Sequence, residues 1–271
     1  MFKIKNISLI LIMGAGLFLA SCEDVIQLDL KEATTRIVID ASLNASGGEC
    51  QVALSRTLGF YAANSTDPVT GADVELIQAS GSKIPLTEVK SGFYKVTGIH
   101  MDPGERLQMA VTISADEKYL AETVVPYPVF LDSLNLSRGI GDPRPGGTPV
   151  FLLRPEWKDP TGVDNYYRFK VVKNGELQSG FNITSDRKVD GTVLEQPLFR
   201  YFLEPGDTVH LEFQSIDSVS YSYFNQINDM ARPSFVAATP YNPIGNFDNG
   251  ALGYFGAYFS EVRDLIVTLG R

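Results

Sequence analysis

Short segments in which apolar and polar residues alternate recur along most of this chain, and they constrain the fold more than any other feature. Between residues 36 and 43, the side chains of Ile37, Ile39 and Leu43 fall on one face, as in a half-buried strand. Residues 44–49 contain Gly47-Gly48 and predict a hairpin loop into the next strand. Further turn signals follow at the roughly 8–12-residue spacing that is typical of a β-sandwich.

The same pattern predicts two domains. Pro126-Tyr127-Pro128 interrupts the series of strands, so we expect an N-terminal β-sandwich over 36–127 and a C-terminal one over 128–271. Further strands are expected at 73–78, 93–97, 106–114, 119–125, 130–136, 150–154, 166–173, 180–184, 208–213 and 257–269. The predicted fold class is therefore all-β, with two immunoglobulin-like sandwiches.

One short helix is expected in the second domain. Aromatic and aliphatic residues recur there at every third position, which is compatible with one face of a helix. Asp217 or Ser218 is placed to cap its start, and Pro233 is placed to stop it.

The N-terminal segment has the composition of a bacterial lipoprotein signal. Lys3 and Lys5 precede an apolar run over 7–19, and Leu19-Ala20-Ser21-Cys22 resembles a lipobox. We expect residues 1–21 to be a signal peptide, Cys22 to carry acyl chains, and 22–35 to contain the tether and a first strand region. The alternative is a transmembrane helix, but a run of 13 residues is shorter than the roughly 20 that span a bilayer.

Charge and cysteine content narrow the possible partners. Without residues 1–21 the chain keeps 21 basic residues against 32 acidic ones, which argues against a nucleic-acid partner. Once Cys22 is acylated, Cys50 has no partner for a disulfide within the chain. Cys50 alternates with Val52 and Leu54, so we interpret it as a small buried hydrophobe.

The sequence gives little support for catalysis or metal binding. His100 and His210 have no neighbouring ligand at metal-site spacing, and no nucleophile elbow or phosphate-binding loop occurs. Acidic residues such as those in Asp159-Pro160 and Pro205-Gly206-Asp207 stand in turn sequences, where a carboxylate accepts bonds from nearby amides. We therefore expect no catalytic residue, no cofactor and no metal site.

Calcium is the alternative for one acidic segment. Asp186, Asp190 and Gly191 fill the first, fifth and sixth places of an EF-hand loop. However, Lys188 takes the third place, and Pro197 stands where the distal glutamate belongs.

The C-terminal tail is the expected partner surface. Residues 242–256 combine Asn, Gly and aromatic residues, which supply contact area at a low entropy cost. We assign this role to Tyr254, Phe255, Asn246 and Asn249, together with the loop Arg138–Pro149. Tyr254 and Phe255 are adjacent, so on an extended segment one is expected to be buried and the other available. The alternative is that both pack inside the second sandwich.

Several short pieces in a fixed order give the chain a resemblance to a known family. They are Cys22-Glu23-Asp24, Leu28-Asp29-Leu30, Ile37-Val38-Ile39, Leu54-Ser55-Arg56-Thr57, Pro68 to Val74, Gly92-Phe93-Tyr94, Asp159-Pro160, Asn165 to Arg168, Pro205-Gly206-Asp207, Asn246 to Gly250 and Gly253 to Gly256. Together they resemble the Bacteroidota outer-membrane lipoproteins catalogued as domain of unknown function 4249. The resemblance implies an outer-membrane address and association with TonB-dependent receptors, and it supplies no catalytic residue.

These observations predict a non-enzymatic accessory or binding subunit, held in the outer membrane by acylated Cys22 beside a TonB-dependent barrel. Glu23 and Asp24 resemble the surface-export signal of such lipoproteins, so we expect the cell surface rather than the periplasm. Two alternatives stay open. A cleft with two carboxylates roughly 5–9.5 Å apart would indicate a glycan- or peptide-degrading enzyme. A removable edge strand would indicate a fimbrial or adhesin-type assembly protein.

Replacing Cys22 tests the anchor. Cys22→Ala removes the thiol that would carry the acyl chains, each buried CH₂ of which contributes about 0.8 kcal/mol to membrane binding. The variant should appear in the soluble fraction after a carbonate wash, whereas the wild type should sediment with the outer membrane. If the variant still sediments, acylation is not the anchor.

Overall fold

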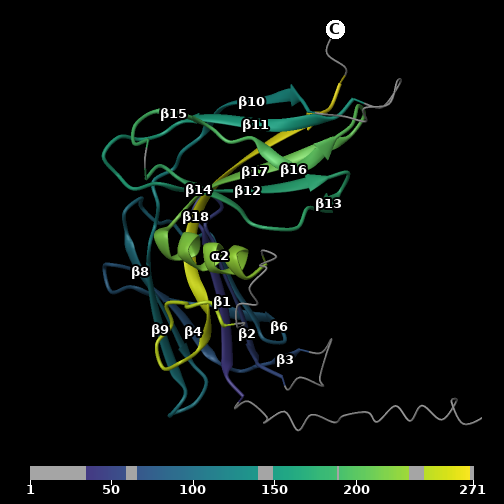
Figure 1. The fold of residues 1–271 in the computed structure, drawn as a ribbon. Helices are drawn as coiled ribbons and strands as arrows, with labels where there is room; N and C mark the ends of the chain where they lie inside the picture. Colours follow the sequence, from purple (N-terminus) through teal and green to yellow (C-terminus); the bar gives the residue numbers. More distant parts are fainter. Residues whose placement is uncertain (1–34, 59–65, 140–148, 188, 232–240, 269–271) are drawn as a thin grey trace, which may run out of the picture. The chain divides into compact units, whose positions relative to one another are not determined.

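The structure is a computed structural model that describes residues 35–58, 66–139, 149–187, 189–231 and 241–268. Cys22 and most of the loop Arg138–Pro149 lie outside these residues. The described part consists of strands in three sheets and one helix, so the predicted all-β class with a single helix is confirmed (Figure 1). No helix in these ranges has the length and apolarity that a membrane span requires.

The elements follow each other closely along the chain. The first half contains β1 (Ile37–Asn44), β2 (Glu49–Arg56), β3 (Asp67–Pro68), β4 (Asp73–Ile77), β5 (Lys83–Pro85), β6 (Thr87–Lys90), β7 (Phe93–Thr97), β8 (Arg106–Thr112) and β9 (Lys118–Val124). The second half contains β10 (Leu131–Arg138), β11 (Phe151–Lys158), β12 (Tyr166–Lys173), β13 (Glu176–Leu177), β14 (Asn182–Ser185), β15 (Val193–Glu195), β16 (Leu198–Leu203), β17 (Thr208–Ile216), α2 (Ser218–Ala231) and β18 (Leu252–Ile266).

The first sandwich packs the sheet β5-β4-β8-β9 against strands β18, β1, β2, β7 and β6 of the ten-stranded sheet. Alternate residues of both sheets fill its core, as period-two patterning predicts: Ile39 and Val52 from one side meet Met109 from the other. Cys50 is fully buried in this core, which confirms its interpretation as a small hydrophobe. Burial raises the pKa of its thiol to about 12.

The second sandwich packs the sheet formed by β10, β11, β15 and β16 against β12, β17 and the end of β18. Trp157 lies at the centre of its core with 1% of its surface exposed. Its ring centroid lies 4.9 Å from that of Tyr167 and 5.3 Å from that of Phe213. Aromatic packing of this kind contributes about 0.5–1.5 kcal/mol per pair beyond the buried area.

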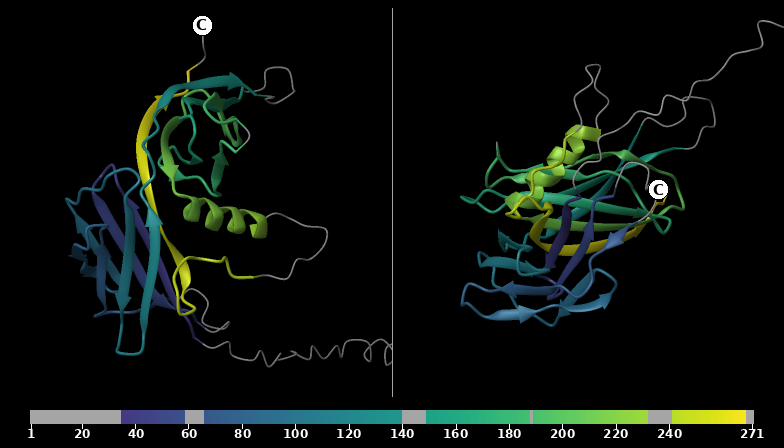
Figure 2. Two further views of the ribbon diagram at one scale, coloured as in Figure 1. Left: turned by 90° about the vertical axis from the view of Figure 1, so that its left-hand side faces the viewer. Right: turned by 90° about the horizontal axis from the view of Figure 1, so that it is seen from below.

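Strand β18 belongs to both sandwiches, which the predicted domain boundaries did not anticipate. Its first part, Leu252–Tyr258, pairs in parallel with β1, and its second part, Tyr258–Ile266, pairs antiparallel with β17. In Figure 2 the strand, in yellow, runs from one group of strands into the other. Residues 128–271 therefore do not form a separate second domain, because the closing strand also completes the first sandwich. β18 also begins at Leu252, whereas the closing strand was expected to begin at residue 257.

Helix α2 begins as predicted, with Asp217 as its cap. The carboxylate of Asp217 accepts a hydrogen bond from the backbone N–H of Ser220 at 2.6 Å. Its second oxygen accepts bonds from the hydroxyl of Thr123 and from the backbone N–H of Ala257. The cap thus connects the helix to β9 and to β18.

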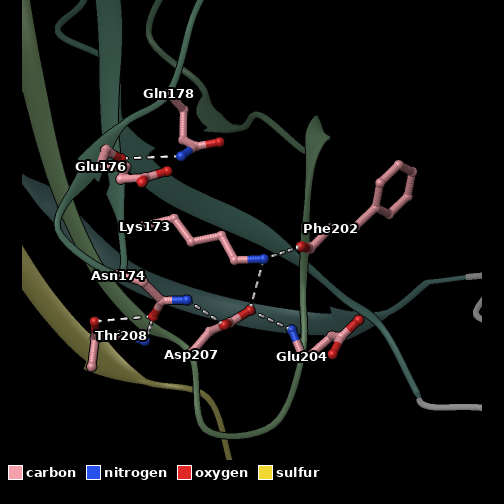
Figure 3. Close-up of polar contacts among 8 residues, drawn as sticks. All are labelled: Lys173, Asn174, Glu176, Gln178, Phe202, Glu204, Asp207 and Thr208. Carbon is pink, nitrogen blue, oxygen red and sulfur yellow. Dashed lines mark hydrogen bonds and ion pairs between the residues drawn. The ribbon is translucent and has the colours of Figure 1, made fainter.

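In the turn that contains Pro205-Gly206-Asp207, at the far end of the second sandwich, the side chain of Asp207 binds several neighbouring groups (Figure 3). Asp207 accepts bonds from the backbone N–H of Glu204 at 2.7 Å and from the side chain of Asn174 at 2.7 Å. The ammonium group of Lys173 lies 2.9 Å from the same carboxylate. Partial burial raises the pKa of Asp207, but these hydrogen bonds and Lys173 outweigh it and hold the pKa below the ordinary value. The turn interpretation of this acid is confirmed.

Asp207→Asn should destabilise the protein at neutral pH by about 2 kcal/mol, because it removes the charged acceptor of these bonds. A carboxylate whose pKa is lowered by folding adds stability above its unfolded pKa, near 3.9, and that stability is lost as the pH falls through the folded pKa. Urea unfolding of both proteins should therefore give curves that differ at pH 7 and converge at a pH below the folded pKa of Asp207. The exposed Asp102→Asn, in a similar Pro-Gly turn, is the control. An equal difference at both pH values would contradict the role of the charge.

Candidate binding site

The four residues expected to form a partner surface lie at the start of β18 and in the segment before it. Asn246 and Asn249 belong to the segment that runs along β9, and their side chains are engaged within the molecule. Asn246 donates to the backbone oxygen of Glu122 at 2.6 Å and also accepts from the backbone N–H of Phe255 at 2.8 Å. Asn249 donates to the backbone oxygen of Lys118 at 2.8 Å. Their side-chain amides thus hold the tail to β9 and β18. We had expected these amides to contact a partner protein instead.

Tyr254 and Phe255 point to opposite faces of β18, as expected for adjacent residues of a strand. Phe255 is fully buried in the core of the first sandwich, rather than the second, so it offers no surface to a partner. Tyr254 lies on the other face, where its ring stacks on that of Tyr223 from α2 at 4.6 Å. Burial, followed by the nearby charge of Asp40, raises the pKa of Tyr254.

Tyr254 forms part of the wall of a pocket beneath α2. The pocket has a volume of about 450 Å³, within the usual size range of small-molecule sites. Its wall comes from strands that are far apart in the sequence: β1, β2, β12, β17 and β18, with α2 as the cover. It is thus built on the face of the ten-stranded sheet at the place where the two sandwiches share β18.

Arg168 is the main polar group of this pocket. Its guanidinium carbon lies 4.2 Å from the centre of the Phe224 ring and 5.0 Å from that of Phe181. Such cation–π contacts hold the planar guanidinium in place. Burial lowers the pKa of Arg168, while Tyr254 and Glu212 are the strongest opposing influences.

Two buried polar atoms near this pocket lack a hydrogen-bond partner among the described residues. They are Nε of Arg168, a donor, and Oε1 of Gln214, an acceptor. Buried polar atoms are normally paired, so each unpaired one calls for a water or a ligand. Asp40, which is solvent-exposed, also lines the pocket. Aromatic walls with an unpaired donor and an unpaired acceptor suit a polar group that both accepts and donates, such as an amide or a sugar hydroxyl pair.

A larger hollow of about 690 Å³ lies where the segment after β9 meets the start of α2 and the loop before β12. We favour the pocket beneath α2 as the binding site, because the half-buried guanidinium of Arg168 and unpaired polar atoms occur together there. The sequence did not reveal this site: Asp40, Arg168 and Tyr254 stand on three separate strands, and only the aromatic content of α2 and β18 pointed toward it.

The structure also brings three of the acidic residues close together. Asp159 and Asp190 accept backbone bonds, as expected of turn residues: Asp159 from Gly191 at 2.9 Å and Asp190 from Gly162 at 2.8 Å. However, they also converge with Asp186, and one carboxylate oxygen from each of the three lies within 4.8 Å of the others.

The exposed His210 pairs with Asp264 at 2.7 Å, on the outward face predicted for it.

Alanine substitutions separate the two neighbours on β18. Phe255→Ala should lower the free energy of unfolding by about 3–5 kcal/mol, because it leaves a cavity in the first core. Tyr254→Ala should cost about 1–2 kcal/mol, since it removes only ring packing on the pocket side. Urea unfolding measures both values. A larger loss for Tyr254→Ala than for Phe255→Ala would contradict the opposite placement of the two side chains.

The chain was compared with curated proteins, with solved structures and with protein families. Among curated proteins, none matches the sequence. Among solved structures, the two-domain fibronectin type III segment of chicken tenascin is similar to 86% of this chain over 99% of its own length, at 11% identity. Its TM-score is 0.24, which is too low to support any argument. The family described as "Domain of unknown function (DUF4249)" matches residues 23–263, and the chain therefore belongs to this family.

Proposed function

We propose that the protein is a non-enzymatic lipoprotein of the outer membrane in a Bacteroidota cell, and that it serves as an accessory or binding subunit of a TonB-dependent receptor system. The position of Cys22 is the main observation that supports this proposal. It follows Leu19-Ala20-Ser21 at the end of a short apolar run, where lipoprotein processing would leave it as an acylated first residue. A membrane anchor raises the effective concentration of the protein near a barrel in the same membrane without requiring any new contact.

The pocket beneath α2 supports a binding role. Its walls come almost entirely from sheet strands and helix α2, so a ligand or a partner side chain would meet a preformed surface. Arg168, whose guanidinium contacts the stacked rings of Phe181 and Phe224, offers a donor to an acidic or amide group. In the proposed function, this pocket takes a polar group of the receptor or of its cargo.

The geometry of the acidic residues also favours binding over hydrolysis. Glycoside hydrolases place their two carboxylates roughly 5–5.5 Å or 6.5–9.5 Å apart around an accessible substrate. Asp159 and Asp186 are 1% and 2% exposed, and their oxygens lie within 4.8 Å of one another. These two carboxylates are therefore too enclosed to act as such a pair on a substrate.

Copurification tests the proposal. The tagged chain is extracted from native membranes with a mild detergent, and its partners are identified by mass spectrometry. We expect a TonB-dependent receptor to be enriched with the wild type and to be lost with Cys22→Ala. Enrichment of fimbrial subunits instead, or of no outer-membrane barrel, would overturn the accessory role.

A second arm of the same experiment asks whether the pocket takes part. Tyr223→Ala removes the ring that stacks on Tyr254 and should reduce receptor recovery several-fold. Tyr127→Ala, which alters a side chain that is 50% exposed, is the matched control and should leave recovery unchanged. Equal recovery with both variants would exclude the pocket as the contact.

A further inference from the structure

Three aspartates from different segments converge at one end of the second sandwich. Asp159 directly follows β11, Asp186 directly follows β14, and Asp190 stands in the loop that leads to β15. Each contributes one carboxylate oxygen to a group whose members all lie within 4.8 Å of one another. The first two are almost fully buried, with 1% and 2% of their surface exposed, and Asp190 is exposed.

Unpaired oxygens mark this group as more than a set of turn residues. Oδ1 of Asp186 is buried and has no hydrogen-bond partner in the described part of the chain. The same holds for Oδ1 of Asn165, a residue only 6% exposed, whose backbone N–H donates to the other oxygen of Asp186 at 3.0 Å. Unpaired buried acceptors are costly in a folded protein, and two of them beside one carboxylate cluster indicate a missing positive partner.

The charges lead to the same conclusion. Among the described residues, no lysine or arginine forms an ion pair with Asp159, Asp186 or Asp190. Burial raises the pKa of Asp186, and the negative charges of Asp159 and Asp164 raise it further. Carboxylates gathered in this way require either a proton or a cation to offset their repulsion.

The spacing fits calcium. Calcium binds oxygen ligands at about 2.3–2.6 Å, so two oxygens on opposite sides of one ion are separated by up to about 4.6–5.2 Å. Magnesium binds at about 2.0–2.1 Å and would require a tighter group, with a maximum near 4.2 Å. Three oxygens that all lie within 4.8 Å of one another can therefore share one calcium ion. We propose that Asp159, Asp186 and Asp190 bind a calcium ion, with Asn165 as a further oxygen ligand.

This proposal revises the expectation of no metal site. The sequence placed Asp186 and Asp190 in an imperfect EF-hand loop and treated Asp159 as a turn residue. The structure replaces the EF-hand pattern with a different ligand set, because Asp159 joins from a segment 27 residues before Asp186. The ion would connect the loop after β11 to the loop before β15, and it would do so independently of any membrane partner.

The position of the site provides an optical signal. Trp157, the single tryptophan of the chain, lies two residues before Asp159. Tyr167 packs on Trp157 and donates its hydroxyl hydrogen bond to Asp159. Terbium, which replaces calcium at oxygen sites, should therefore be excited through Trp157 and emit when it is bound.

The test uses the purified full chain after treatment with EGTA. Added calcium should raise the midpoint of thermal unfolding by about 5–10 °C at a concentration near 100 times its Kd. Terbium should give a sensitised emission that calcium displaces. Magnesium at the same concentration should give a smaller thermal shift.

Charge-neutralising variants locate the ion. Asp190→Asn keeps an oxygen for the N–H of Gly162, so it should fold normally while losing most of the calcium shift and the terbium signal. Asp186→Asn should lose both signals as well. Without calcium, the Asp186→Asn variant should unfold at the wild-type temperature or higher, because the substitution removes one of three mutually repelling negative charges. The control Asp116→Asn removes one charge from an exposed site and should keep both signals.

Three results would overturn the proposal. The first is a wild-type chain whose midpoint does not respond to calcium and that gives no terbium emission. The second is a calcium response that Asp190→Asn leaves unchanged, which would place the ion elsewhere. The third is an equal loss of signal in Asp116→Asn, which would indicate a general effect of charge.

Discussion

The pairing of β18 with two different strands is the interaction on which the rest of the structure depends. Its first part hydrogen-bonds to β1 and its second part to β17, and the two registers meet at Tyr258. Gly253 permits this arrangement: it has a φ of +94°, and a Cβ there would lie 2.0 Å from the backbone oxygen of Ile39. Gly245 is equally constrained, because a Cβ on it would lie 1.7 Å from the oxygen of Gly253. Without this strand, both sandwiches would lose a member of their common sheet.

The position of β18 in turn fixes the helix and the pocket. Asp217 is buried, and burial raises its pKa, yet it accepts hydrogen bonds from Ser220, Ala257 and Thr123 that oppose this shift. A buried carboxylate with several donors is costly to disturb, because removal of the acceptor leaves those donors unpaired. Gly256 allows the close contact, since a Cβ there would lie 2.0 Å from the hydroxyl of Ser220. The pocket around Arg168 is therefore a consequence of how the sheet is closed.

Local patterns predicted local structure well. β7 and β12 have the predicted bounds, β1 is within one residue of them, and Asp217 caps the helix as expected, because alternation and capping act over a few residues. The parallel pairing of β1 with β18 was not predictable in this way: Val38 and Leu252 are 214 residues apart, and neither segment carries a signal for the other. The same reason explains why the contacts of Asn246 within the molecule were not expected. Asn246 resembles an adaptable loop residue in sequence, but its amide is used to hold the segment to Phe255 and Glu122.

The same long-range pairing has a consequence for folding. The edge of β1 that faces β18 stays unpaired until residues 252–258 are available, and unpaired edges invite contact with other chains. Long-range strand pairing is also slow, because the entropy of closing the chain is lost before the contacts form. In a chain that crosses a membrane unfolded, as the proposed lipoprotein would, this edge therefore stays exposed until residues 252–258 have crossed as well. Calcium at Asp159, Asp186 and Asp190 would act later and more locally, because all three ligands lie within the second half of the chain and can meet before β18 has joined β1.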